Sequence, residues 1–247
     1  YFINYFCIMI EIFNKKDQAY GEFNNGEIIE NKPIGFPTDN GPLLPYSNIF
    51  YWAYAEAKED STIGIHPHKG FEIITFVLEG SIKHYDTLIN KWIELNKGDV
   101  QIIKAGSGIS HSEFLKKNSS IFQIWLDPNV YKSVYKSPEY KDYKSIFFKS
   151  TNKKKIFIGE DSSIKIDTEN IEIFELKLDE DVKLDLNTKK YYSIYVLAGD
   201  LLINNKEITC HDFIKISNIE KISIKIVSES KLFILSSPLN VSYETYK

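Results

Sequence analysis

Short runs of apolar residues recur along the whole chain and are separated by turn-forming residues. The runs are rich in Ile, Val, Tyr and Phe, which favour β-strands over helices. Many short strands at this spacing are typical of an all-β sandwich or barrel. The predicted strands are Ile49–Ala55, Phe71–Leu78, Ile82–Tyr85, Val100–Ile103, Ile121–Leu126, Ile171–Leu178, Tyr192–Leu197, Asp212–Ile216 and Ile222–Val227.

The sequence also predicts several turns, one short helix and a first strand. Hairpin turns are expected at Ile89–Lys91, Leu95–Gly98 and Asn204–Lys206, where Asn, Gly or Lys interrupt apolar runs. Helical periodicity is weak, and the one short helix predicted is Val130–Lys136, after an Asp-Pro-Asn turn. The apolar start Tyr1–Phe13 has no basic segment before it and no small-residue cleavage site after it, so we expect a first strand rather than a signal peptide.

The sequence contains an internal repeat. Phe76–Ile82 resembles Tyr195–Leu201, and Gly98–Ile102 resembles His211–Lys215. Two copies of one β unit account for the chain length. We therefore predict two domains, residues 1–134 and residues 135–247, with the boundary in a stretch rich in Lys, Ser and Tyr.

Composition and charge exclude several function classes. The chain has 247 residues, is 43% hydrophobic and carries a net charge of -4, which argues against a nucleic-acid binder with a basic surface. No arginine is present, so no guanidinium group is available to recognise phosphate or carboxylate. No apolar stretch is long enough to span a membrane. The two cysteines, Cys7 and Cys210, are too few for a disulfide framework, and we expect a reduced, cytoplasmic setting.

The main candidate for chemistry is a set of polar residues in the first half of the chain. His66 and His68 are two residues apart, and His111 and Glu113 repeat that spacing on a second predicted strand. Residues two apart on a strand point to the same face, so each pair can aim at one point. Three imidazoles and one carboxylate suit a divalent metal such as Fe(II), Mn, Ni, Cu or Zn. The alternative is that all four are polar surface residues.

The second copy of the repeat lacks these ligands. Equal offsets from Gly80 and Gly199 lead from the first pair to Asp185 and Asn187, and equal offsets from Asp99 and Asp212 lead from the second pair to Ile224 and Ile226. Isoleucine cannot bind a metal, so we expect one metal per chain, in the first domain. His211 falls in a predicted turn and is expected at the surface.

Several segments carry a family resemblance. Over about residues 36 to 145 the chain resembles the pirin family of bicupins, proteins with two tandem cupin domains of the jelly-roll β-barrel type. The segments that carry it are Gly64–Glu72, Val77–Gly80, His84–Asp86, Gly98–Gln101, Ala105–Glu113, Gln123–Leu126 and Pro138–Tyr143.

The resemblance implies a function. In the family, the residues that match His66, His68, His111 and Glu113 bind a single metal, usually iron, and the second domain is usually metal-free. It implies a quercetin 2,3-dioxygenase-like reaction on a flavonol or a similar chelating small molecule, in which Glu113 also accepts a substrate proton. The alternative is a non-enzymatic, iron-binding regulator that senses redox state and binds a protein partner. A third possibility is a barrel that the metal only stabilises. A monomer is expected.

The chain also departs from the cupin pattern. The family usually has Arg at the position of Lys69, and the general cupin motif has a carboxylate ligand where this chain has Ile73. We therefore favour Glu113 over Glu72 as the ligand, and expect Glu72 to orient an imidazole. His84 shares the strand parity of the site and either lines the cavity or faces outward.

Overall fold

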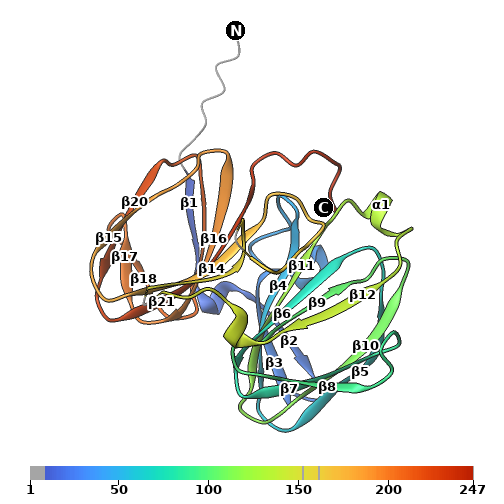
Figure 1. Ribbon diagram of the computed structural model, residues 1–247. Coiled ribbons are helices and arrows are strands. Elements are labelled where there is room, and N and C mark those ends of the chain that lie inside the picture. Colours follow the sequence, from blue (N-terminus) through green and yellow to red (C-terminus); the bar gives the residue numbers. More distant parts are fainter. Residues whose placement is uncertain (1–8, 152, 161, 247) are drawn as a thin grey trace. The chain divides into compact units, whose positions relative to one another are not determined.

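The computed structural model describes residues 9–151, 153–160 and 162–246, and these form two compact units. The N-terminal barrel consists of residues 18–147, 166–168 and 243–246, and the C-terminal barrel consists of the remaining described residues. Each unit contains two antiparallel sheets (Figure 1). The all-β prediction is confirmed.

The N-terminal barrel pairs a seven-stranded sheet, in the order β12-β9-β6-β11-β4-β3-β2, with a four-stranded sheet, β5-β10-β7-β8. Its elements are β2 (Ala19–Phe23), β3 (Ile28–Ile34), the 3-10 turn η2 (Pro37–Asp39), β4 (Ile49–Ala57), β5 (Ser61–His68), β6 (Glu72–Glu79), β7 (Ser81–Asp86), β8 (Trp92–Asn96), β9 (Val100–Lys104), β10 (Ile109–Leu115), β11 (Ser120–Leu126), α1 (Val130–Ser133), β12 (Glu139–Tyr143) and η3 (Ser145–Phe147).

The C-terminal barrel pairs a six-stranded sheet, β1-β19-β16-β21-β14-β13, with a four-stranded sheet, β15-β20-β17-β18. Its elements are β1 (Met9–Phe13), η1 (Lys15–Asp17), β13 (Lys154–Ile158), β14 (Glu172–Leu178), β15 (Val182–Asp185), β16 (Lys190–Ala198), β17 (Leu201–Ile203), β18 (Lys206–Ile208), β19 (Phe213–Ser217), β20 (Lys221–Ile226) and β21 (Ser230–Pro238).

The two barrels have the same strand order, which confirms the internal repeat. The sequence β9-β6-β11-β4-β3 in one sheet corresponds to β19-β16-β21-β14-β13 in the other, and β5-β10-β7-β8 corresponds to β15-β20-β17-β18. Gly80 and Gly199 begin the same turn in each copy, with φ angles of 69° and 81°. Only glycine adopts this left-handed region without strain, which explains its presence at both positions.

Alternating apolar residues from both sheets fill each barrel. In the N-terminal barrel, Ile28, Ala55 and Val77 of the large sheet pack against Ile82, Leu95 and Leu115 of the small sheet. This apolar core occupies only part of the interior. The remaining interior positions carry the polar residues of the candidate site.

One predicted turn is wrong in kind. Leu95–Gly98 is not a hairpin, because β8 pairs with β7 whereas β9 pairs with β6 in the other sheet. The segment carries the chain from one sheet of the barrel to the other. The same turn residues occur in hairpins and in such connections, so the sequence alone does not tell them apart. The other two predicted hairpin turns join paired strands, β7 to β8 and β17 to β18.

The two compact units are not separated by a single point in the sequence, because each contains segments from both halves of the chain. β1 pairs with β19 in the C-terminal barrel, and β12 occupies the corresponding edge of the N-terminal barrel beside β9. The boundary after residue 134 stays a prediction. Of the predicted first strand, residues 9–13 form β1 and residues 1–8, with Cys7, lie outside the described residues.

Candidate metal centre

Three histidines converge on one point inside the N-terminal barrel. His66 and His68 lie on β5, and His111 lies directly opposite His66 on the neighbouring β10. Nε2 of His111 is 2.9 Å from Nε2 of His66 and 2.9 Å from Nε2 of His68. His111 Nε2 offers either one hydrogen atom or one lone pair, so it cannot make a full hydrogen bond to both neighbours, whereas a cation could bind the lone pairs of all three nitrogens.

A bulge in β5 aims these side chains. Between His111 and Glu113 the register shifts by one residue, so that Glu113 lies opposite Ile63. Bulges re-aim side chains and are common beside functional sites. In the bulge, His66 Nδ1 donates to the Gly64 carbonyl at 2.8 Å, which leaves the lone pair on Nε2, facing His111. A carbonyl that fixes the imidazole in this way is the usual support of a metal-binding histidine.

Burial keeps the imidazoles of His68 and His111 neutral. Loss of solvent, together with the neighbouring imidazoles His111 and His66, lowers the pKa of His68 to about 3. Loss of solvent, then His66 and His84, lowers the pKa of His111 to about 3 as well. Neutral imidazole is the form that binds metals.

Glu113 lies two residues beyond His111 and is fully buried. Its Oε1 accepts a hydrogen bond from Gln101 Nε2 at 3.2 Å, and its Oε2 accepts one from Gln123 Nε2 at 2.9 Å. The two glutamines hold the carboxylate from both sides. Gln101 and Gln123 were not singled out from the sequence, although each lies on a predicted strand between apolar neighbours, a pattern that could have marked them.

A second group of metal-capable side chains adjoins the first and shares His111. Ligand atoms of His84, His111 and Glu113 lie within 4.8 Å of one another, as do those of the three clustered histidines. His84 is fully buried, so its interior position is established. Its Nε2 lies 2.7 Å from Asp86 Oδ2, and its ring stacks on Tyr140 with centroids 4.5 Å apart. Within the described part of the chain, His84 Nδ1 has no hydrogen-bond partner.

Glu72 does not orient an imidazole, which corrects that expectation. Its buried carboxylate accepts hydrogen bonds from the backbone N–H of Asp167 at 2.7 Å and of Thr168 at 2.9 Å. These contacts fix residues 166–168 against β6. The expectation rested on Glu72 being an even number of residues from His66 and His68. That spacing could not show that a segment nearly a hundred residues away binds this carboxylate.

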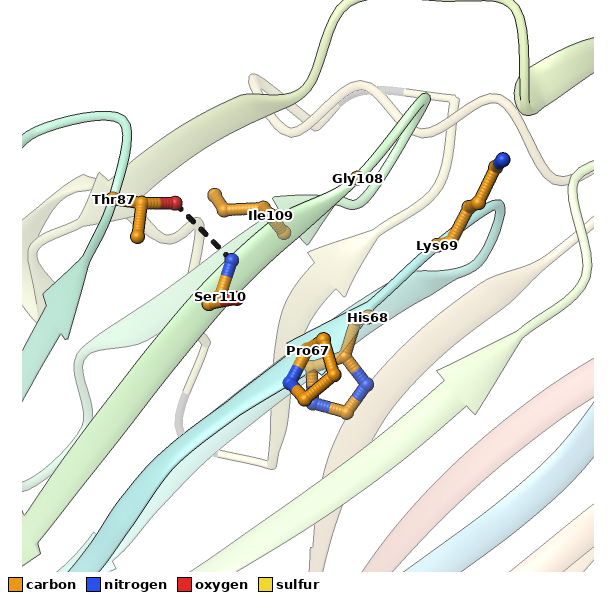
Figure 2. Close-up of a pocket in the computed structure, with 7 residues that line it drawn as sticks. All are labelled: Pro67, His68, Lys69, Thr87, Gly108, Ile109 and Ser110. Atoms are coloured by element: carbon orange, nitrogen blue, oxygen red, sulfur yellow. Dashed lines mark hydrogen bonds between the residues drawn. The ribbon is translucent and has the colours of Figure 1, made fainter.

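A pocket leads to the histidine cluster. It has a volume of about 400 Å³ and lies between the end of β5, the start of β10 and the loop after β7. Figure 2 shows His68, Lys69 and Ile109 around it, with Ser110 N–H donating to Thr87 Oγ1 at 3.2 Å. This volume falls within the range of small-molecule sites. Because His68 belongs both to the pocket wall and to the cluster, a ligand in the pocket can contact this imidazole.

The C-terminal barrel carries aliphatic residues at the corresponding positions. Strand pairing aligns His111 with Ile222, and Glu113 with Ile224. It aligns His66 and His68 with Leu184 and Leu186, which pack against the apolar core of that barrel.

The alignments differ from those predicted from the sequence. The positions that correspond to the first pair shift by one residue, and those that correspond to the second pair shift by two. Asp185 points outward and pairs with Lys221, and Ile226 aligns with Leu115. Ile224 is nevertheless buried and Ile226 packs against the core, as predicted. Among the described residues, no group of metal-capable side chains lies in this barrel. His211 lies in a turn and is partly buried, with its Nδ1 3.1 Å from the Tyr195 hydroxyl.

Two jelly-roll barrels with one polar interior define the chain as a bicupin. Residues 46–126 match the Pirin family. The quercetin 2,3-dioxygenase of Escherichia coli strain K12 is 30% identical over 183 residues, which cover 71% of this chain and 76% of that protein. A pirin-like protein of Caulobacter vibrioides is 42% identical over 82 residues, covering 32% of this chain and 35% of that protein. The chain belongs to the pirin family.

Solved structures support the same fold. The crystal structure of the bacterial pirin YhhW from Escherichia coli in complex with nickel(II) aligns with a TM-score of 0.80 at 24% identity, covering 93% of this chain and 99% of that one. At this identity the similarity concerns the fold alone. No helix in the described ranges is long and apolar enough to cross a membrane.

Proposed function

We propose that the N-terminal barrel binds one divalent metal through His66, His68, His111 and Glu113 and uses it for a quercetin 2,3-dioxygenase-like reaction. The observation that carries this proposal is the convergence of the three Nε2 atoms, 2.9 Å apart around His111. The C-terminal barrel supports it, because aliphatic residues at the same positions fill a stable interior without any of these polar groups. The polar set is therefore not a requirement of the fold.

The ligand set favours a particular kind of ion. Three imidazoles and one carboxylate suit Fe(II), Mn or Ni, which take five or six ligands and so would leave positions open for substrate and O2. The nickel(II) complex of YhhW is consistent with this preference. We propose Fe(II) as the metal in this protein.

The metal, the pocket and Glu113 would have different roles in the reaction. When bound, the metal would polarise a substrate oxygen and exchange electrons with O2. The 400 Å³ pocket beside His68 would hold a planar chelating substrate such as a flavonol. Glu113, held by Gln101 and Gln123, would accept the proton of the substrate hydroxyl.

The proposal is tested first by metal content and then by oxygen uptake. His66→Ala combined with His111→Ala should abolish stoichiometric metal binding, whereas His211→Ala, in the other barrel, should leave it unchanged. The Fe(II)-loaded wild-type protein should then consume O2 in the presence of flavonols. Unchanged metal content in the double variant would refute the ligand assignment. Bound iron without O2 uptake or flavonol binding would favour the iron-sensing regulator instead.

A further inference from the structure

Trp125 stands between the histidine cluster and a buried tyrosine. Its ring centroid lies 4.8 Å from that of His68 and 4.8 Å from that of Tyr51. Trp125 and Tyr51 are direct cross-strand neighbours on β11 and β4, so the pleat of the sheet puts both rings on one face. Trp125 Nε1 donates to Gln123 Oε1 at 2.9 Å, and Gln123 in turn donates to Glu113. The rings of His68, Trp125 and Tyr51 thus form a continuous path of contacts.

Tyr51 has a buried proton acceptor. Its hydroxyl donates to the Glu30 carboxylate, with distances of 3.2 and 3.3 Å to the two oxygens. Tyr51 is 6% exposed and Glu30 is 7% exposed, so water does not compete for this contact. Burial raises the pKa of Glu30 to about 7, against the opposing effects of Lys32 and Tyr51, while Glu113 and Asp39 raise it further. A carboxylate with this pKa can accept the proton that the phenol releases when it is oxidised.

Burial and the Glu30 charge also raise the pKa of Tyr51. The phenol therefore remains protonated, and losing an electron requires it to lose a proton as well. Glu30 is within reach of that proton, whereas the neighbouring Phe36 ring, with its centroid 5.2 Å from that of Tyr51, offers no acceptor.

We propose that Tyr51 is a redox-active residue that supplies an electron, through Trp125, to the metal centre at His66, His68 and His111 when that centre is oxidised, and that Glu30 accepts the phenolic proton. This inference rests on the proposed function, because it requires the metal. Tyr51 would supply the second electron to an oxidant that reacts at the centre when no substrate is bound, and the iron would remain as Fe(III).

The chemistry balances with hydrogen peroxide as the oxidant. Peroxide takes two electrons and two protons from solution to give two waters. One electron comes from Fe(II), which becomes Fe(III), and the other from Tyr51, which becomes a neutral tyrosyl radical. The O–O bond of peroxide breaks, and the two protons from solution form new O–H bonds in the two waters. The phenolic O–H bond of Tyr51 breaks, and its proton forms an O–H bond on Glu30.

A comparison of Tyr140 with Tyr51 shows why the carboxylate of Glu30 matters. Like Tyr51, Tyr140 is separated from the cluster by one ring: it stacks on His84, whose ring centroid is 5.5 Å from that of His111. The Tyr140 hydroxyl donates to the amide oxygen of Gln101, at 3.5 Å. An amide is a poor base, so oxidation of Tyr140 leaves its proton without a suitable acceptor. The radical should therefore settle on Tyr51.

The experiment mixes Fe(II)-loaded protein anaerobically with one equivalent of hydrogen peroxide, freezes the mixture and records electron paramagnetic resonance spectra. Iron content is measured first on the same samples. We expect a tyrosyl radical whose hyperfine structure narrows when the protein carries ring-deuterated tyrosine. Tyr51→Phe should remove most of this signal. Trp125→Phe, which keeps an aromatic ring, should slow its formation several-fold.

Two further variants separate redox chemistry from packing. Glu30→Gln keeps the hydrogen bond and removes the base, so it should lower the radical yield while iron content stays at the wild-type level. Tyr54→Phe, on the same strand but the opposite face, is the matched control and should leave the signal unchanged.

The possible failures are distinguishable. Protein that binds no iron would refute the metal centre and this inference with it. Iron that is bound and oxidised by peroxide, with no tyrosyl radical or with an equal radical in Tyr51→Phe, would overturn the role of Tyr51 and leave the metal centre standing.

Discussion

Glu113 of the N-terminal barrel and Ile224 of the C-terminal barrel occupy the same position on corresponding strands. Glu113 pairs with His84 across β10 and β7, and Ile224 pairs with Ile203 across β20 and β17. The same comparison aligns Gln101 with Ile214 and Gln123 with Ile234. One barrel thus has a polar interior where its sister has isoleucine. Buried polar groups cost free energy unless they are fully hydrogen-bonded, so their retention on one side indicates a function.

Replacing the carboxylate should separate metal binding from catalysis. Glu113→Gln preserves the shape of the side chain and an oxygen that can still bind a metal weakly. If Glu113 also accepts the substrate proton, turnover with a flavonol should fall about a hundredfold or more, with a smaller change in flavonol affinity. Oxygen uptake and metal analysis on the same samples measure both effects. Glu79→Gln, at an exposed position, is the control. An equal loss of metal and activity would mean that Glu113 binds the metal but does not accept the substrate proton.

Metal substitution tests whether the reaction depends on redox chemistry. Zn(II) has no accessible second oxidation state. Protein loaded with Zn(II) should bind a flavonol, as seen by a shift of its absorption band, but should consume O2 far more slowly than protein loaded with Fe(II). Comparable rates with the two metals would show that the metal acts only as a Lewis acid.

The raised pKa of Glu30 predicts a specific pH dependence of stability. Its pKa rises from 4.5 to about 7 on folding, mainly through burial. Between these values the folded protein binds more protons than the unfolded chain, so this contribution is complete below the lower value and is lost as the pH rises through the upper one. The loss amounts to about 3 kcal/mol.

Glu30→Gln should remove this dependence, because the amide does not titrate. Urea unfolding of metal-free protein at about pH 5 and about pH 8 gives the change in unfolding free energy for each form. The wild-type protein should lose more stability between the two pH values than the variant does. Identical changes in both would mean that Glu30 titrates normally.

Gly80 should tolerate no side chain. Its φ angle is 69°, and an added Cβ would lie 2.3 Å from Ser119 Oγ and 2.9 Å from Ser119 Cα. Gly80→Ala should therefore lower the unfolding free energy by about 2 kcal/mol or more, since the left-handed conformation alone costs about 1–2 kcal/mol. Gly64→Ala is the control, because nothing lies within 4 Å of the added atom. Thermal unfolding of both variants measures the difference.

The sequence by itself determined the fold class and the histidine cluster. Alternating apolar runs specify strands because a strand buries every second residue, and the two-residue spacing of His66 and His68 puts both on one face through the same geometry. The family resemblance pointed to the same residues. These features depend on local geometry, which a sequence pattern records directly.

The tertiary structure alone decided the features that depend on strand pairing. The bulge in β5 shifted the alignment of the repeats, so that Leu184 and Leu186, rather than Asp185 and Asn187, correspond to the first histidine pair. Glu72 found its partners in residues 167 and 168, far along the chain. The glutamines that hold Glu113 come from two other strands. Register and long-range contacts arise from how strands meet in space, because the same residue pattern is compatible with several pairings until packing selects one.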